Sequence, residues 1–189
     1  MPRKSGDFVK VEYIENGLSD RQKQEVWEIL CQCDKEFIPP LSARNSTSQN
    51  QLLAGTGKDS APHAYFAEMI KQNFILTVVD NRVVGFMTFK KAYSCPELES
   101  FGESLYVTTV CIKHNLRGKG LLTKMYREIE HNVTRKLGCF RISTRTWSKN
   151  HAQIHVLMKL GYRQVAIIKN DRGEGIDTIY FGKHVDLDD

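Results

Sequence analysis

The sequence predicts an α/β sandwich in which a mixed sheet is flanked by helices. Short runs of alternating apolar and polar residues, typical of strands, are interspersed with longer runs whose apolar residues recur every three or four positions, as in amphipathic helices. The order along the chain is one strand, two helices, three strands, a helix, a strand, a helix and two strands, which fits helices packed on a sheet. At 189 residues, with 41% hydrophobic and 26% charged residues, the chain is expected to form one domain over residues 1–189.

The first predicted elements are a strand and a helix. Residues 8–14 roughly alternate apolar and polar side chains, as a strand does. Ser19 and Gln22 have the spacing of a capping box, which predicts a helix start at this point. Pro39 and Pro40 prevent that helix from continuing.

The next segment is predicted to be a loop. Residues 41–58 are rich in Ser, Asn, Gln, Thr and Gly, and the segment is long for a connection in a compact domain. We expect a mobile loop, for which a functional lid and simple disorder are equal alternatives. Pro62 then begins a second helix.

The remaining elements are predicted from the same patterns. Strands over residues 74–79 and 82–90 flank Asp80-Asn81, which predicts a two-stranded hairpin. An apolar strand over residues 105–112 is followed by a loop and a long amphipathic helix that ends at Gly138. The last elements are a strand over residues 140–147, a helix after Asn150, and strands over residues 163–169 and 176–181.

Composition and charge exclude several classes of protein. No apolar run has the length of a membrane span, and the first seven residues lack the apolar core of a signal peptide. The five cysteines are odd in number and scattered, which favours reduced thiols in a cytoplasmic protein over a disulfide framework. The net charge of +5 fits a polyanionic cofactor or plain solubility, whereas no basic and aromatic residues interleave as in nucleic-acid binders.

A basic, glycine-rich loop between a strand and a helix is the most informative motif. Such a loop presents backbone N–H groups and a positive helix end to an anion, so Arg117, Gly118, Lys119 and Gly120 predict a cradle for a diphosphate. The motif is not a Walker A loop, and it lacks the third glycine of the dinucleotide-binding fingerprint, where Thr123 stands.

The loop resembles a motif of the GNAT superfamily of N-acetyltransferases. The acyl-CoA loop of that family reads Arg/Gln-x-x-Gly-x-Gly/Ala, and residues 117–122 match it except at Leu122, where a small residue is usual. Residues 150–162 resemble the family's Asn followed by a helix ending in Lys-x-Gly-Phe/Tyr, and residues 175–183 resemble its closing strand. The resemblance implies a mixed, mainly antiparallel sheet flanked by helices, with acetyl-CoA as the co-substrate.

The resemblance also implies which residues bind the cofactor. The strand backbone before the loop would pair with the pantetheine arm, the loop would hold the diphosphate, and Asn150 would contact the arm unless it only caps its helix. Helical geometry places Gln153 and Leu157 on the face of Asn150. The expected cofactor-binding residues are Val110, Cys111, Ile112, Arg117, Gly118, Lys119, Gly120, Leu121, Leu122, Asn150, Gln153 and Leu157.

The catalytic groups are less clear from the sequence. Leu157 stands where the family commonly has a Tyr that protonates the CoA sulfur, so the usual general acid is missing. Glu103, just before the cofactor strand, is the favoured base, with Glu97 and Glu99 as rivals. His151 and His155 lack a third ligand, so we expect no metal.

The sequence therefore predicts transfer of an acetyl group from acetyl-CoA to a primary amine. The acceptor is either a small-molecule amine or a peptide or protein amine, with no membrane or nucleic-acid partner expected, and a homodimer is left open. The alternative is a non-catalytic acyl-CoA-binding module, which the leucine at position 157 favours.

Overall fold

The computed structural model describes residues 9–49, 52 and 60–186, and its centre is a seven-stranded sheet with strand order β1-β2-β3-β4-β5-β7-β6. All neighbouring strands are antiparallel except β4 and β5, which are parallel. The predicted mixed, mainly antiparallel sheet is thus confirmed. The strands are β1 (Val9–Ile14), β2 (Asn73–Val79), β3 (Arg82–Tyr93), β4 (Ser104–Ile112), β5 (Arg141–Trp147), β6 (Arg163–Ile168) and β7 (Thr178–His184).

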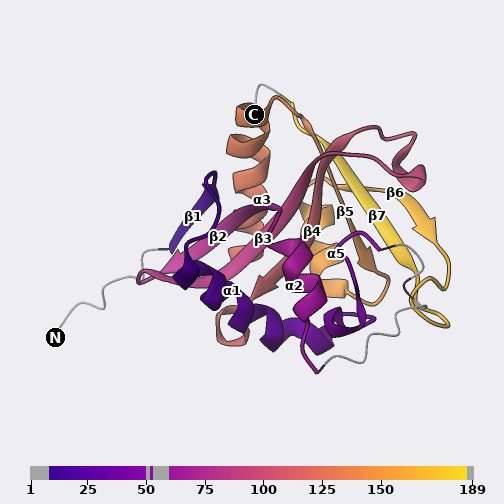
Figure 1. The fold of residues 1–189 in the computed structure, drawn as a ribbon. Helices are drawn as coiled ribbons and strands as arrows, with labels where there is room; N and C mark the ends of the chain where they lie inside the picture. Colours follow the sequence, from indigo (N-terminus) through magenta and orange to yellow (C-terminus); the bar gives the residue numbers. More distant parts are fainter. Residues whose placement is uncertain (1–8, 50–51, 53–59, 187–189) are drawn as a thin grey trace.

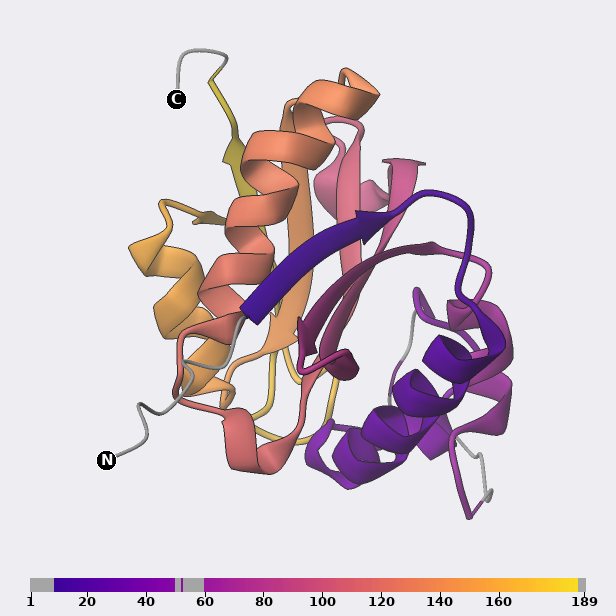
Figure 2. The same cartoon turned by 90° about the vertical axis from the view of Figure 1, so that its left-hand side faces the viewer.

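Helices cover both faces of the sheet (Figures 1 and 2). One face carries α1 (Asp20–Cys33) and α2 (His63–Met69), whose buried side chains pack on β2 and β3. The other carries α3 (Leu121–Glu128), which continues through a π-helical turn (Ile129–Val133) into α4 (Thr134–Leu137), together with α5 (His151–Lys159). Each face therefore has its own apolar core, and the sheet holds the two in fixed relation.

Local sequence signals explain several element ends. Ser19 and Gln22 form the predicted capping box, with both reciprocal bonds present, and α1 starts directly after it. Asp80 and Asn81 both have positive φ, as a tight two-residue hairpin turn requires, and they join β2 to β3 as predicted. Gly138 adopts a left-handed conformation with φ of 65° and ends the helix there, also as predicted.

The polar segment after α1 contains a short turn and several buried side chains. A short 3₁₀ turn spans Leu41–Ala43, and Leu41, Arg44 and Thr47 are buried. The expected mobility of residues 41–58 stays a prediction, and residues 50, 51 and 53–58 lie outside the described residues. Polar side chains hold this segment, because Arg44 binds the Pro39 carbonyl and Thr47 accepts a hydrogen bond from Gln72.

The parallel pair β4 and β5 is joined only at one end. Pairing covers residues 105–107 of β4 and 142–144 of β5, after which β4 stays with β3 and β5 stays with β7. The two strands consequently diverge over residues 108–112 and 145–147. A gap in the middle of a sheet leaves backbone hydrogen-bonding groups without a neighbouring strand, and it positions the candidate site.

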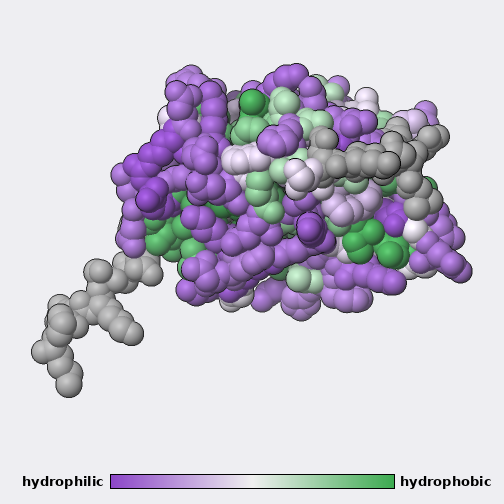
Figure 3. All heavy atoms as spheres, turned by 60° about the horizontal axis from the view of Figure 1, so that its bottom comes forward, coloured by the Kyte–Doolittle hydropathy of each residue, from purple (hydrophilic) through white to green (hydrophobic). Residues whose placement is uncertain are grey.

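The surface and the thiols agree with a protein that folds without disulfides. All five cysteines are free. Hydrophilic side chains dominate the face in Figure 3, where the apolar surface is divided into separate patches. Among the helices of the described residues, none combines the length and apolar character needed to cross a bilayer.

Candidate active site

A cleft of about 460 Å³ opens where β4 and β5 diverge. Its walls come from the second half of β4, the loop before α3, the start of α5, and the end of α1. Ten of the twelve expected cofactor residues line it: eight come from β4, the loop and the start of α3, and Asn150 and Gln153 come from the N-terminal end of α5. The lining residues are Cys33, Glu36, Phe37, Val110, Cys111, Ile112, Leu116, Arg117, Gly118, Gly120, Leu121, Leu122, Thr123, Trp147, Asn150, Ala152, Gln153 and Val156.

The backbone of β4 turns hydrogen-bonding groups into this cleft. Thr108 has no partner on β3, because Thr88 pairs with Thr109 and Phe89 pairs with Val107, so a β-bulge lies where the strands part. The N–H of Lys113 bonds to Val84 on the β3 side, and strand alternation therefore turns the N–H groups of Val110 and Ile112 toward the gap. An extended ligand backbone can pair with these groups as an added strand would.

The loop before α3 has the backbone conformation of an anion cradle. Gly118 and Gly120 both have φ of 75°, a region that favours glycine, and a Cβ at either would meet no other atom within 4 Å. Gly120 is also the residue that precedes the first turn of α3, where unpaired N–H groups collect. The open space over the glycines gives a phosphate direct access to the backbone, whereas the exposed Lys119 does not line the cleft.

Arg117 is held at the mouth of the cleft by contacts from α1 and its 3₁₀ extension. Its guanidinium lies 2.8 Å from a Glu36 carboxylate oxygen, donates to the Ile112 carbonyl at 3.0 Å, and lies 3.2 Å from the Cys33 sulfur. The Glu36 carboxylate also lies 2.5 Å from His114 Nε2. Cys33, Glu36 and His114 are close enough to one another to hold a cation, but the guanidinium of Arg117 occupies two of these three ligands, which disfavours a metal.

Asn150 and Gln153 belong to one hydrogen-bonded network on the β5 side. The Asn150 side chain caps α5 by accepting from the Gln153 N–H, and it donates to the Gln153 side chain and to Thr146 at 3.0 Å each. Gln153 in turn donates to the Tyr126 hydroxyl at 3.4 Å. Burial raises the pKa of Tyr126 to about 12, so this phenol is neutral at physiological pH and lies behind Gln153, away from the cleft.

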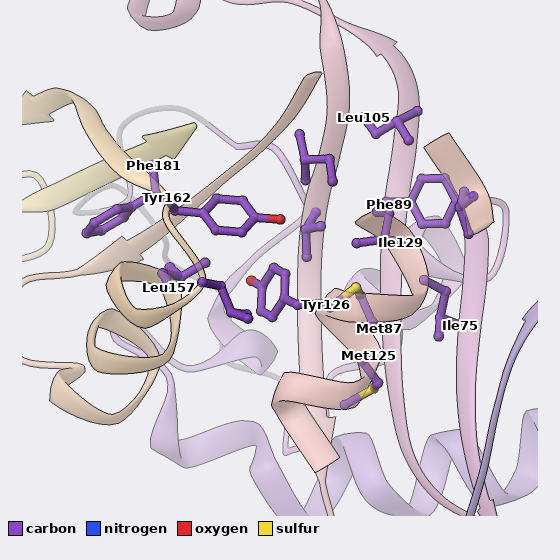
Figure 4. Close-up of a cluster of buried hydrophobic side chains, with 14 residues drawn as sticks. Ile75, Met87, Phe89, Leu105, Met125, Tyr126, Ile129, Leu157, Tyr162 and Phe181 are labelled. Carbon is purple, nitrogen blue, oxygen red and sulfur yellow. The ribbon is translucent and has the colours of Figure 1, made fainter. Parts of the chain in front are cut away.

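Besides Lys119, two expected site residues do not line the cleft. Leu157, expected on the cofactor face, is fully buried in the same core cluster as Tyr126 and Tyr162 (Figure 4) and does not line the cleft. Glu103 is exposed at the start of β4 and lines a different cleft with Arg141 and His184. Seven residues of extended strand separate it from Val110, about 23 Å at 3.3 Å per residue, which removes Glu103 as a base for chemistry in this cleft.

The comparison with known families is decisive. Residues 34–162 match the model of the acetyltransferase (GNAT) family, which is more than half of the chain. The chain belongs to the GNAT acetyltransferase family. The matched span begins in the turn after α1 and ends after α5, so it contains every residue that lines the cleft except Cys33.

Solved structures support the same fold for this GNAT acetyltransferase. An N-acetyltransferase from Staphylococcus aureus Mu50 is 12% identical with a TM-score of 0.65, and the match covers 95% of this chain and 99% of that one. The structure of yncA from Salmonella typhimurium with its cofactor acetyl-CoA is 15% identical with a TM-score of 0.65 and 95% coverage of each chain. The ribosomal-protein-S18-alanine N-acetyltransferase from Escherichia coli is 11% identical with a TM-score of 0.60, covering 95% and 96%. A search of curated proteins found no match.

Several residues of the GNAT cleft carry no signal in the sequence. Cys33, Glu36 and Phe37 come from the end of α1, where the apolar periodicity predicts only a core-facing helix. Phe37 packs on Trp147 of β5 with ring centroids 5.7 Å apart, and the pair closes the cleft on one side. Only the tertiary fold brings these segments to the loop, so no local pattern could have identified them.

Proposed function

We propose that this GNAT acetyltransferase transfers the acetyl group of acetyl-CoA to a primary amine. The proposal is supported chiefly by two binding surfaces, the edge of β4 and the glycine loop, that adjoin each other in one cleft. The N–H groups of Val110 and Ile112, which have no neighbouring strand, lie on the same cleft wall as the glycine loop at Gly118 and Gly120. A ligand with an amide-containing arm and a diphosphate fits both halves together.

The chain's own groups would bind the cofactor by backbone contacts. The N–H groups of the loop and the Arg117 guanidinium would hold the diphosphate, and the β4 groups would align the pantetheine arm. Asn150 and Gln153 offer amide groups on the opposite wall. When bound, acetyl-CoA supplies an activated acyl group whose carbonyl can accept a hydrogen bond from a β4 N–H.

Rate acceleration would come from proximity and from polarisation of that carbonyl. Fixing the amine and the acyl carbon in one geometry removes a large part of the entropic barrier. A fixed N–H donor stabilises the negative charge that develops on the carbonyl oxygen. Both effects need only the rigid frame of the diverging strands.

Proton transfer would not use a dedicated carboxylate. Of the described residues that line the cleft, Glu36 alone is acidic, and it pairs with Arg117. A protonated amine has a pKa of about 10 in water, so it must lose a proton to become a nucleophile. Without a base beside it, a chain of water molecules at the cleft mouth would carry that proton to bulk solvent. No Tyr lines the cleft in the described part of the chain, so the thiolate would leave as such or take its proton from water.

The test is release of free thiol from acetyl-CoA in the presence of small amines, antibiotics, peptide N-termini and lysine peptides. Release that depends on one acceptor class, with the acetylated product seen by mass spectrometry, supports the proposal. Saturable acetyl-CoA binding with no release for any class would instead support the acyl-CoA-binding module, which the leucine at position 157 favours. The cytoplasmic location and a homodimer stay predictions, testable by fractionation and by light scattering.

A further inference from the structure

Three arginines converge on a small cavity beside the cleft. The cavity, of about 20 Å³, lies between β4 and β5 on the side of α2 and the polar segment 41–49, and Arg44, Arg145 and Arg172 all line it. It shares Phe37, Val110, Trp147 and Gln153 with the large cleft, so the two spaces meet where the strands part.

Two of these cations are almost completely buried. Arg44 and Arg172 are each 6% exposed, and Arg145 is half-buried. Burial lowers the pKa of Arg44 to about 10 and that of Arg172 to about 9, and Arg145 adds electrostatic repulsion to both. Both side chains are nevertheless charged at neutral pH. Burying several like charges together is unfavourable unless a counter-charge accompanies them.

Within the described part of the chain, no carboxylate forms a direct ion pair with any of the three arginines. Arg44 donates to the Pro39 carbonyl, Arg145 to the Tyr180 hydroxyl and the Gln49 carbonyl, and Arg172 to the Ile38 carbonyl and the Thr178 hydroxyl, and all of these acceptors are neutral. Asp34 and Asp171 raise the pKa of Arg44 and Arg172 respectively, yet within the described residues neither lies within 4 Å of a guanidinium nitrogen.

The nearby tyrosines do not supply the charge either. Burial raises the pKa of Tyr65 and Tyr106, and also that of Tyr180, so these phenols are neutral under ordinary conditions. The neutral bonds described above use two N–H groups of each guanidinium, out of five that the group carries. The remaining donors belong to three side chains that line a space next to the candidate reaction site.

We propose that the three arginines bind a carboxylate of the acceptor, so that the substrate is a small amine that also carries a carboxylate, as an amino acid does. This inference rests on the proposed acetyl transfer and specifies its acceptor. A guanidinium fork matches a carboxylate in two parallel hydrogen bonds. The cavity has room for one or two water-sized groups, since a water needs about 10–15 Å³, which suits a planar carboxylate better than a tetrahedral phosphate.

The arrangement also places the amine. A carboxylate held in the cavity leaves the rest of the substrate to extend past Val110 and Gln153, which line both spaces. An amine one or two carbons from the carboxylate would then enter the gap between β4 and β5, where the acyl group is expected. The arginines therefore act as specificity-determining and positioning residues, and they make no bond to the reacting atoms.

The experiment compares amino acids with their amides, which differ only in the negative charge. With acetyl-CoA, we expect at least one amino acid to exceed its amide in kcat/KM by 30-fold or more. The variant Arg172→Gln should reduce kcat/KM for the acid by about 10- to 100-fold, the range expected for a charged hydrogen bond, and for the amide by less than threefold. Arg172→Lys should recover part of the loss.

Matched variants separate recognition from folding. Arg141→Gln removes the same charge from an exposed position on the same strand as Arg145, outside both cavities, and should change nothing. If Arg172→Gln does not fold, Arg145→Gln replaces a half-buried member of the cluster and should show the same selective loss. Equal kcat/KM for acids and amides, or equal losses for both in the folded variant, would overturn the proposal.

A binding readout distinguishes failure of this inference from failure of acetyl transfer. The chain has two tryptophans, and Arg172 lies over the Trp147 ring at 5.7 Å. In a Trp27→Phe background, amino acids should therefore change Trp147 fluorescence saturably, and Arg172→Gln should abolish the change. If no amine releases thiol but this binding persists, acetyl transfer fails and the carboxylate site stands. No fluorescence change with any amino acid, or a change with phosphoethanolamine alone, would overturn the carboxylate assignment.

Discussion

Glu36 should weaken cofactor binding, because its carboxylate pairs with the arginine that is expected to hold the diphosphate. The two side chains are 2.8 Å apart and are 43% and 40% exposed, so solvent screens their interaction strongly. We therefore predict that Glu36→Gln tightens the binding of acetyl-CoA. The control is Glu28→Gln, an exposed glutamate on the preceding helix α1 that does not line the cleft.

The magnitude follows from Coulomb's law with water-like screening. A carboxylate about 6 Å from a phosphate charge is repelled by about 0.7 kcal/mol at a dielectric constant of about 80, and salt near 0.15 M roughly halves this. Two phosphate charges restore the sum to about 0.7 kcal/mol, and release of Arg117 from an exposed ion pair adds between 0 and about 1 kcal/mol. The sum is about 0.7 to 1.7 kcal/mol, so the dissociation constant should fall by about three- to twentyfold.

Titration calorimetry at low and high salt measures this effect. The gain in Glu36→Gln should be largest at low ionic strength and shrink at about 0.5 M salt, where the Debye length falls to about 4 Å. Glu28→Gln should bind acetyl-CoA as the wild type does. Weaker binding in Glu36→Gln would refute the reasoning, since it would mean that Glu36 orients Arg117 for the diphosphate.

Three further predictions concern the loop, the core and the buried phenols. Gly120→Ala and Gly17→Ala each introduce a side chain at a positive φ with open space around it, so each variant should lose about 1 kcal/mol of stability. Only Gly120→Ala should also weaken the binding of acetyl-CoA. Equal affinities in the two variants would argue against the cradle. Leu157→Tyr should lower the melting temperature without raising kcat, because position 157 is fully enclosed in the core; a faster enzyme would place that side chain back at the cofactor. Burial raises the pKa of Tyr126 to about 12, above its unfolded value of about 10, so the native state keeps this proton to higher pH than the unfolded state does. The free energy of unfolding should therefore fall as the pH rises from 10 to 12. Urea unfolding should show a less steep fall in Tyr126→Phe.

Sequence reasoning succeeds where the cause of a structure is local. The capping box at Ser19, the hairpin turn at Asp80 and Asn81, and the left-handed stop at Gly138 each depend on a few neighbouring residues, and all were predictable. The glycine loop belongs to the same class, because its backbone conformation follows from its own glycines. Its role in holding a diphosphate stays a prediction.

The sequence does not predict whether a residue on a given face of an element lies at the cleft or in the core. Leu157 shares the helical face of Asn150 and Gln153, but α5 runs from the cleft into the core, so that face is open at Gln153 and sealed at Leu157. Glu103 adjoins the correct strand but lies at its far end. Hydrophobic periodicity predicts which side of a helix or strand a residue lies on. It does not predict how far along that element the residue lies from the cleft.

The arginine cluster shows a second limit. Arg44, Arg145 and Arg172 come from three segments separated by 101 and 27 positions, and each alone looks like an ordinary charged residue. The polar composition around Arg44 predicts a solvated loop, whereas hydrogen bonds to backbone carbonyls allow that side chain to be buried. Only the completed sheet brings the three charges to one cavity.

Titration of acetyl-CoA into the wild type and the Arg117→Glu variant tests the central claim most directly. The wild type should bind one acetyl-CoA per chain. The variant places an anion against the diphosphate and removes a charged hydrogen bond, so its affinity should fall by about 100-fold or more. Lys124→Glu makes the same charge reversal on the exposed side of α3, outside the cleft, and should bind nearly as the wild type does. Unchanged affinity in Arg117→Glu would contradict the assignment of this cleft to the cofactor.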